Sequence, residues 1–521
     1  MSLFIFILVL FLLLLGYIFY GKILFKLFEM DYNRLTPAVT KKDGVDFVPA
    51  KNWLVIFGHH FASIAGAGPI VGPVFAYIYW GWVGVLLWIV LGSIFMGAVQ
   101  DFSTLVVSLR EGGSSIAEIT SKYISSKARV IFMVFVIFSL IIVIAVFADI
   151  CVKSFINERG IIIPSLGLIP VAMIVGLLMY NLKFDTFLST FLGLAMLIGL
   201  IFLGKSTTLQ LNIVNPYLFW MIVILTYAFF ASVIPVNILL QPRDYISSFL
   251  LFFSIAVAFL GIVIKPLPIG SGYIFRFSSP QGTIFPLMFI TVACGSISGF
   301  HSLVSSGTTS KQLPSEKDTL LVGYGGMILE AILATIALFC VVFGLKSIPQ
   351  GKTPTELFSL GFSQIVFFLG DYGQFIALLI LNTFILTTLD TATRITRLLT
   401  EELLGIKNKY LSTLLIISVV SYFCLKGTWQ VLWPIFGASN QLVAAIALLV
   451  VSAYLINKKK SFKVTLIPSI IMFIITISAL FIKMVVFLKE NKYLLAFLSF
   501  ILIILGLFIV EEFRRLKNYV S

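Results

Sequence analysis

Long apolar runs separated by short polar stretches fill almost the whole chain. A helix needs about 20 apolar residues to cross a bilayer, and fifteen runs are long enough when short or broken ones are allowed. We therefore expect an all-α, polytopic membrane protein with about 15 transmembrane helices. The expected spans are residues 2–20, 52–80, 81–109, 128–152, 161–182, 185–204, 213–235, 244–264, 283–304, 319–345, 372–396, 410–426, 429–456, 464–487 and 492–512.

Composition agrees with this class and excludes others. The 521 residues are 60% apolar and only 11% charged, whereas a soluble domain carries about 25% charged residues. We expect one transmembrane domain over 1–521, with the lipid bilayer as its environment. The net charge of +14 is explained by basic loops, so no nucleic-acid partner is expected.

Residues 52–80, NWLVIFGHHFASIAGAGPIVGPVFAYIYW, cannot cross the membrane as one unbroken helix. Pro69 and Pro73 remove two backbone donors, and the glycines favour a departure from helical geometry. Freed backbone groups are tolerated in a membrane only beside protein or a water-filled cavity. We expect a cavity here, with the second half-helix, starting near Ile70, pointing its positive end at an anion. The expected site includes Gly66, Gly68 and Gly72.

A second interrupted span is expected at residues 217–245, where Pro235 and Pro242 break the pattern. Two broken spans, each opening a group of five, are typical of inverted-repeat transporters. The predicted repeats cover 52–204 and 213–400, with additional helices over 410–512.

The positive charges are distributed unevenly between the two sets of loops. About two-thirds of the 36 lysines and arginines fall in the loops after odd-numbered spans and in the C-terminal tail. This predicts an N-terminus outside the cell, a cytoplasmic loop over residues 28–51 and a cytoplasmic C-terminus. The first span lacks a basic leader and a cleavage site, so we expect it to be retained.

His59, His60 and His301 are the three histidines. Adjacent residues on a helix point about 100° apart, so His59 and His60 are not expected to share a metal, and no metal site is predicted. Either one could contact substrate or carry a proton, because histidine titrates near physiological pH. The alternative is a structural hydrogen bond to a carbonyl freed at the break.

Asp101 lies deep in the third span, where an isolated aspartate costs on the order of 3 kcal/mol and suggests function. Its alternative role is a cap or ion pair near Arg110. Asp149 and Glu330 raise the same question more weakly, and Lys153 lies four residues after Asp149, which favours a structural pair.

Small and hydroxylated residues surround His301 in residues 295–309, GSISGFHSLVSSGTT. Tight helix packing explains part of this pattern. The hydroxyls of Ser305, Ser306 and Thr308 could also contribute to an ion or carboxylate site, which would leave room for sodium coupling.

Asp390 and Arg394 are four residues apart in TTLDTATRITR, so they could pair on one helix face. The pair would either hold the helix end or act as a gate, or its arginine would reach a carboxylate. Asn440 and Gln441 follow Pro434 and Gly437 at another expected break, and such amides more often bond neighbouring helices than substrate.

The sequence offers little support for an enzyme. No nucleophile–base pair or metal set is evident, and Cys151, Cys294, Cys340 and Cys424 sit alone in apolar runs. Residues 199–206, GLIFLGKS, match a nucleotide-binding loop by letter, but no strand or nucleotide domain surrounds them. No cofactor is expected.

Several stretches between about residue 36 and about residue 450 resemble the carbon starvation protein A family of membrane transporters. They are TPAV…DGVDFVPAKNW, GHHFASIAGAGPIVGPV, GAVQDF, ACGSISGFHSLVSSGTT, GYGGMILE, TLDTATRITR and LWPIFGASNQLVAAIALL. The resemblance implies a fold similar to the LeuT-like superfamily and uptake of peptides or pyruvate, coupled to protons, during nutrient limitation.

These observations together predict a multi-pass cell-membrane symporter for a small anionic nutrient, either pyruvate or a short peptide. Protons are the expected coupling ion, with Asp101 or a histidine as carrier. The alternatives are sodium coupling on the same fold, an intramembrane enzyme or a channel.

Overall fold

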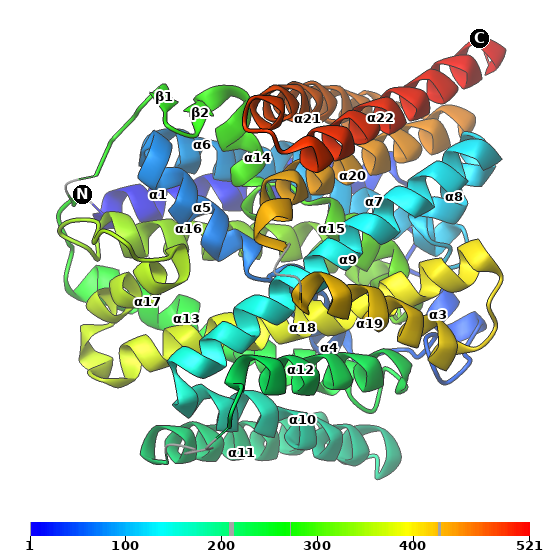
Figure 1. Ribbon diagram of the computed structural model, residues 1–521. Helices are drawn as coiled ribbons and strands as arrows, with labels where there is room; N and C mark the ends of the chain where they lie inside the picture. The colour runs from blue at the N-terminus through cyan, green and yellow to red at the C-terminus, as the bar shows by residue number, and fades with distance from the viewer. Residues whose placement is uncertain (1, 208–212, 271, 426–428, 521) are drawn as a thin grey trace.

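The computed structural model describes residues 2–207, 213–270, 272–425 and 429–520, which are almost entirely helical (Figure 1). The expected all-α polytopic fold is confirmed. Among the described residues, 13 helices are long and apolar enough to cross a membrane. The expected number of about 15 is not confirmed, because α19 (Lys409–Leu425) is shorter and residues 283–304 are divided among short helices.

Thirteen α-helices lie in the described part of the chain before residue 265. In order they are α1 (Ser2–Leu15), α2 (Gly21–Leu27), α3 (Pro37–Thr40), α4 (Trp53–Ile64), α5 (Gly68–Trp80), α6 (Trp82–Gly92), α7 (Ala98–Arg110), α8 (Ile116–Tyr123), α9 (Ser126–Asn157), α10 (Ile162–Gly176), α11 (Thr186–Ser206), α12 (Pro216–Val233) and α13 (Leu240–Ile264).

A two-stranded hairpin follows, β1 (Ser278–Ser279) and β2 (Gly282–Thr283), with Ser278 opposite Thr283. The remaining helices are α14 (Phe289–Thr291), α15 (Gly299–Gly307), α16 (Gly326–Val342), α17 (Pro354–Ile365), α18 (Tyr372–Leu404), α19, α20 (Trp429–Asn457), α21 (Lys463–Lys489) and α22 (Tyr493–Val520). Short π-helical or 3₁₀ turns extend or join several helices, at Gly16–Tyr20, Ser93–Gly97, Arg159–Ile161, Leu177–Asn181, Ile284–Met288, Ala293–Gly295, Thr309–Lys311, Glu316–Asp318, Leu320–Gly325 and Phe367–Leu369.

The break in the first predicted span is confirmed. The side-chain oxygen of Asn52 accepts the N–H of Val55 and caps α4, which ends at Ile64, and α5 begins only at Gly68. Pro69 falls in the first turn of α5, where its missing N–H costs nothing. The half-helix therefore starts two residues before the expected Ile70.

The second break lies elsewhere than expected. Residues 217–245 form two separate helices, α12 and α13, joined by a short connection that contains Pro235, and Pro242 lies in the first turn of α13. The discontinuous span is instead residues 284–307, where the backbone is non-helical between the Ala293–Gly295 turn and α15. The break expected near Gly437 is also wrong, because α20 runs through this position.

Two long helices, α9 with 32 residues and α18 with 33, pack against each other beside the breaks (Figure 1). α12 packs on both of them, and so does α19. In the same way α5 packs on α16, and α15 packs on α7. Each of these half-helices therefore packs on the helix that follows the other break. This exchange of contacts is consistent with the expected LeuT-like inverted repeat, and it favours a second repeat that begins at the 284–307 break. The boundaries 52–204 and 213–400 stay a prediction.

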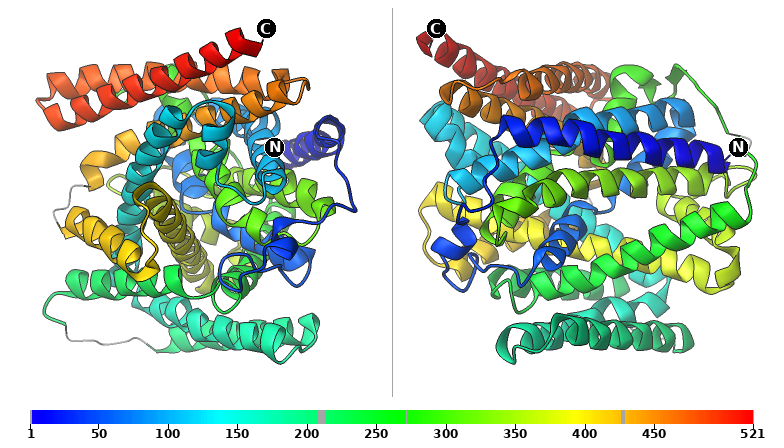
Figure 2. Two further views of the ribbon diagram at one scale, coloured as in Figure 1. Left: turned by 90° about the vertical axis from the view of Figure 1, so that its right-hand side faces the viewer. Right: turned by 180° about the vertical axis from the view of Figure 1, so that it is seen from behind.

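The remaining helices lie outside this assembly. The pair α10 and α11 packs at one edge, and α21 and α22 cover α20 at the opposite edge (Figures 1 and 2). The N-terminus and the β hairpin lie on the left of Figure 1, whereas α3 and the end of α22 lie on the right. The two termini thus lie at opposite ends of this view, and their placement across the membrane stays a prediction. Which side faces the cytoplasm stays a prediction.

Candidate functional site

The two broken spans touch at their breaks. The turn Ala293–Gly295 packs against α5, and a Cβ placed on Gly68 would overlap the Cβ of Cys294. A Cβ on Gly72 would lie 2.6 Å from the backbone oxygen of Thr291. Glycine is therefore required at Gly68 by the Cys294 side chain and at Gly72 by the Thr291 backbone, and the first break packs directly against the second.

A small cavity of about 20 Å³ lies between the breaks. It is lined by residues from α4, the first break, α5, α9, the second break, α15, α18 and α20: Ile64, Gly66, Gly68, Pro69, Val143, Phe147, Cys294, Ser298, Phe300, Thr388, Phe436 and Asn440. A larger cavity of about 110 Å³ shares Gly68, Cys294 and Phe436 with it. That cavity also includes Gly72 and Gln281, so it extends toward the hairpin side of the protein. The start of α5 borders both cavities, as the sequence predicts.

Asn440 and Gln100 hold the second break in its non-helical shape. The Asn440 side chain accepts a hydrogen bond from the N–H of Phe300 at 2.9 Å and donates one to the Ser298 hydroxyl at 2.9 Å. Gln100 donates to the carbonyl of Ser298 at 2.7 Å. Gln441 donates to the carbonyl of Phe289 at 2.8 Å, so both amides bond neighbouring helices, as expected.

His301 lies between two carboxylates from two other helices. Its Nδ1 is 3.1 Å from Asp101 of α7, and its Nε2 is 3.2 Å from Glu330 of α16. All three side chains are buried. Asp101 does not pair with Arg110, which instead bonds Glu316 at 3.1 Å. The pair of Asp101 with Arg110 is therefore not formed, and the weaker candidate Glu330 belongs to the same cluster as Asp101.

A second buried cluster joins α4 to α13 and α18. His59 Nδ1 is 2.7 Å from Asp244 Oδ2, and the Ser63 hydroxyl donates to the same oxygen at 3.2 Å. The neighbouring Arg243 forms an ion pair with Asp390 of α18. Tyr227 of α12 donates to Asp390 as well.

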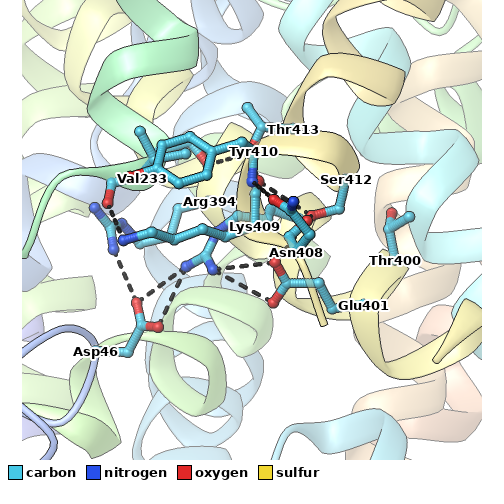
Figure 3. Close-up of polar contacts among 12 residues, drawn as sticks. Asp46, Val233, Arg394, Thr400, Glu401, Asn408, Lys409, Tyr410, Ser412 and Thr413 are labelled. Carbon is cyan, nitrogen blue, oxygen red and sulfur yellow. Dashed lines mark hydrogen bonds and ion pairs between the residues drawn. The ribbon is translucent and has the colours of Figure 1, made fainter. Parts of the chain in front are cut away.

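This arrangement corrects the predicted Asp390–Arg394 pair. Arg394 turns instead to Asp46, at 2.8 Å (Figure 3), and to backbone carbonyls at the end of α12, including that of Ala231. Asp390 and Arg394 are four apart on α18, but each finds a partner from another segment. Tertiary contacts therefore override the local i,i+4 spacing.

His60, Ser306 and Thr308 bond other protein groups in this conformation. His60 Nδ1 is 2.9 Å from the Thr309 hydroxyl. Ser306 and Thr308 donate to the carbonyls one turn earlier in α15, at 2.8 and 3.1 Å, and Ser305 is buried on the same helix. Of the segment, Ser306 lines a separate cavity of about 260 Å³ near residues 31–51. The structure does not bring these side chains to the cavity beside Gly68.

Asp149 forms the expected pair with Lys153 at 2.8 Å, and Tyr217 donates to its other oxygen. Sequence reasoning missed Asp46, Tyr227, Arg243 and Asp244. The available signal was the run QPRDY at the start of α13. Its two charged residues stand next to an apolar span, where charged side chains need buried partners.

Broken spans that meet at a cavity, with buried histidine–carboxylate clusters beside them, define a polytopic membrane transporter. A family model described as "Carbon starvation protein CstA" matches residues 1–347 and 341–479. The chain belongs to this family.

Relatives support the same class. The chain is 33% identical to "Peptide transporter CstA" of Helicobacter pylori, covering 90% of this chain and 80% of that protein. It is 32% identical to "Peptide transporter CstA" of Escherichia coli, covering 89% and 79%. It is 29% identical to "Pyruvate/proton symporter BtsT" of Escherichia coli, covering 88% and 78%. The chain is therefore a transporter and not an enzyme.

Among solved structures, a manganese transporter of Eremococcus coleocola is similar with 13% identity and a TM-score of 0.48, covering 91% of this chain and 99% of that one. A Na⁺-coupled sialic acid symporter has 13% identity and a TM-score of 0.37, covering 92% and 96%.

Proposed function

We propose that the protein is a secondary active transporter that imports a small anionic nutrient, pyruvate or a short peptide, coupled to protons, when carbon is scarce. The names of the relatives support both substrate classes, since one is a peptide transporter and another a pyruvate/proton symporter. The protein would work in the cell membrane with its N-terminus outside and its C-terminus in the cytoplasm.

The substrate carboxylate would bind where the two breaks meet. The first N–H groups of a helix have no intrahelical partner and carry partial positive charge, so the start of α5 at Gly68 suits an anion. The neighbouring cavities supply space on either side of this point. In this conformation Thr388 and Cys294 line the smaller cavity, and Lys483 lines the larger one.

The single observation that carries proton coupling is the position of His301 between Asp101 and Glu330. With a protonated histidine and two ionised carboxyls, the buried cluster would carry a net negative charge. One more proton makes it neutral, and a buried site strongly favours neutrality. Because His301 is on α15, movement of this half-helix would change how readily water reaches that proton.

Sodium coupling is the alternative and has weaker support. The hydroxyls of Thr387 and Thr388 already donate to carbonyls at the end of α4, at 2.9 and 3.3 Å. The hydroxyls of Ser306 and Thr308 donate within their own helix. These oxygens are therefore not gathered around a common point.

Purified protein in liposomes tests the proposal directly. An inward proton gradient should concentrate radiolabelled pyruvate or dialanine inside the vesicles without any sodium gradient, and a protonophore should abolish the accumulation. Accumulation that requires sodium would favour the alternative. Rapid flux that never exceeds equilibrium would indicate a channel.

A further inference from the structure

Both half-helices on the side of residues 31–51 carry a histidine bound to a carboxylate of a neighbouring helix. α4 follows directly after this segment, and the carbonyl of Gln312, just beyond α15, accepts the N–H of Ala50 at 2.9 Å. His301 of α15 contacts Asp101, and His59 of α4 contacts Asp244. The second of these pairs is not needed for the proton step described above.

The buried cluster around His59 is electrically neutral only if it holds one proton. Arg243 and Asp390 neutralise each other as an ion pair. Asp244 then bears the only remaining charge of the cluster unless it shares a proton with His59. Both side chains are fully buried, so the neutral state requires one proton on this pair.

Among the described residues, His59 is the one basic side chain that forms an ion pair with Asp244. The titratable or charged groups next to the pair are Arg243 on α13, Asp390 on α18, Tyr227 on α12 and His60 on α4 itself. Arg243 is already matched by Asp390, and His60 is bonded to the Thr309 hydroxyl. Among the described residues, Asp244 Oδ1 and His59 Nε2 have no hydrogen-bond partner.

The pair also lies where it would sense movement of α4. α4 packs along α13, and Ser63 joins Asp244 to the Thr391 hydroxyl of α18 through hydrogen bonds of 3.2 Å each. If α4 leaves α13, the His59–Asp244 contact breaks and both groups become accessible to water. A proton bound in the closed state can then leave.

We propose that His59 and Asp244 form a second proton site, so that two protons accompany each substrate molecule. The inference rests on the proposed proton-coupled function. In each cycle one proton would bind to the His59–Asp244 pair and one to the cluster at His301, and both would be released on the opposite side. No other bond is formed or broken.

The steady accumulation ratio of the parent protein tests this proposal. Liposomes are loaded with potassium and valinomycin so that the membrane voltage is held at zero, and a gradient of one pH unit is imposed. Pyruvate, or dialanine if pyruvate is not carried, should accumulate about 100-fold with two protons per substrate and about tenfold with one. A tenfold plateau overturns the second site and leaves the proposed function intact. No accumulation overturns the proposed function itself.

Variants assign the second proton to its site. His59→Gln and Asp244→Asn should each lower the plateau from about 100-fold to about tenfold while substrate exchange continues. Asp149→Asn is the matched control, because Asp149 is also a buried aspartate but bonds Lys153 and Tyr217, which belong to neither cluster. It should keep the parent plateau. An unchanged plateau in an active Asp244→Asn protein would overturn the assignment, and the parent measurement decides the ratio even if a variant does not fold.

Discussion

Asp46 and Arg394 are 348 positions apart in the chain, and their side chains meet at 2.8 Å. Arg397, three residues further along α18, bonds the same carboxylate at 3.1 Å and also contacts Glu401. The two arginines are almost fully buried, and Asp46 is 16% exposed. This contact fastens the segment before α4 to α18.

Because of Asp46, the stability of the folded state should depend on pH. Burial alone would raise its pKa, but the charges of Arg394 and Arg397 lower the pKa of Asp46 to about 2 from an ordinary value of 3.8. A lowered pKa stabilises the folded state above about pH 4, and the gain is lost as the pH falls toward 2. The contribution at neutral pH is on the order of 2 kcal/mol.

Thermal unfolding in detergent checks this. Asp46→Asn should be less stable than the parent at pH 6, and the difference should shrink toward pH 3. Asp43→Asn is the control in the same segment, since an amide oxygen can still accept the backbone hydrogen bonds that Asp43 accepts. A stability difference that does not change with pH would contradict the assigned role.

Asp101→Asn should lower the steady accumulation of substrate at least tenfold. Asparagine has nearly the same shape but cannot titrate, so the cluster with His301 and Glu330 loses its exchangeable proton. Exchange of labelled for unlabelled substrate should persist in part, because exchange needs the site to alternate but not to cycle the proton. A variant that accumulates substrate as well as the parent would make Asp101 structural.

Gly68→Ala should already impair transport, and Gly68→Leu should abolish it. Any β-carbon at this position overlaps Cys294, so the two breaks must separate. Cys294→Gly in the same protein should restore part of the activity of Gly68→Ala. Gly199→Ala in α11 is the control, because its Cβ would meet nothing within 4 Å. Normal uptake by Gly68→Leu at normal membrane abundance would place the substrate elsewhere.

The orientation can be read with an impermeant thiol reagent. Lys42→Cys and Arg514→Cys should react only after the membrane is permeabilised, because both belong to the positive-rich side. Lys352→Cys, between α16 and α17, should react on intact cells. These three positions are exposed in the structure. Labelling of position 42 or 514 from outside would reverse the orientation.

The first break could be predicted because its cause is local. Prolines and glycines in residues 65–73 exclude a continuous helix whatever surrounds them. The second break has a weaker signal, because residues 292–299 contain Gly295 and Gly299 but no proline. Its shape depends on Asn440 and Gln100, which are distant in sequence, so only the folded structure reveals it.

The same distinction holds for the charges. The pair Asp149–Lys153 follows from helix periodicity and is present. Asp390 and Arg394 have the same i,i+4 spacing, but Arg243 of α13 forms the ion pair with Asp390 instead. A buried ion pair needs strict geometry and full desolvation, and spacing along one helix cannot anticipate a partner from another.

The connection between residue 50 and α4 has almost no spare length. The N–H of Ala50 is bonded to Gln312, Asn52 already caps α4, and Lys51 alone separates them. α4 has 12 residues and is about 18 Å long, so a tilt of about 10° at the break moves its start by about 3 Å. That displacement is as large as the hydrogen bonds that hold the segment in place. α4 can therefore tilt only if the segment from Asp46 to Ala50 detaches from its partners as one unit.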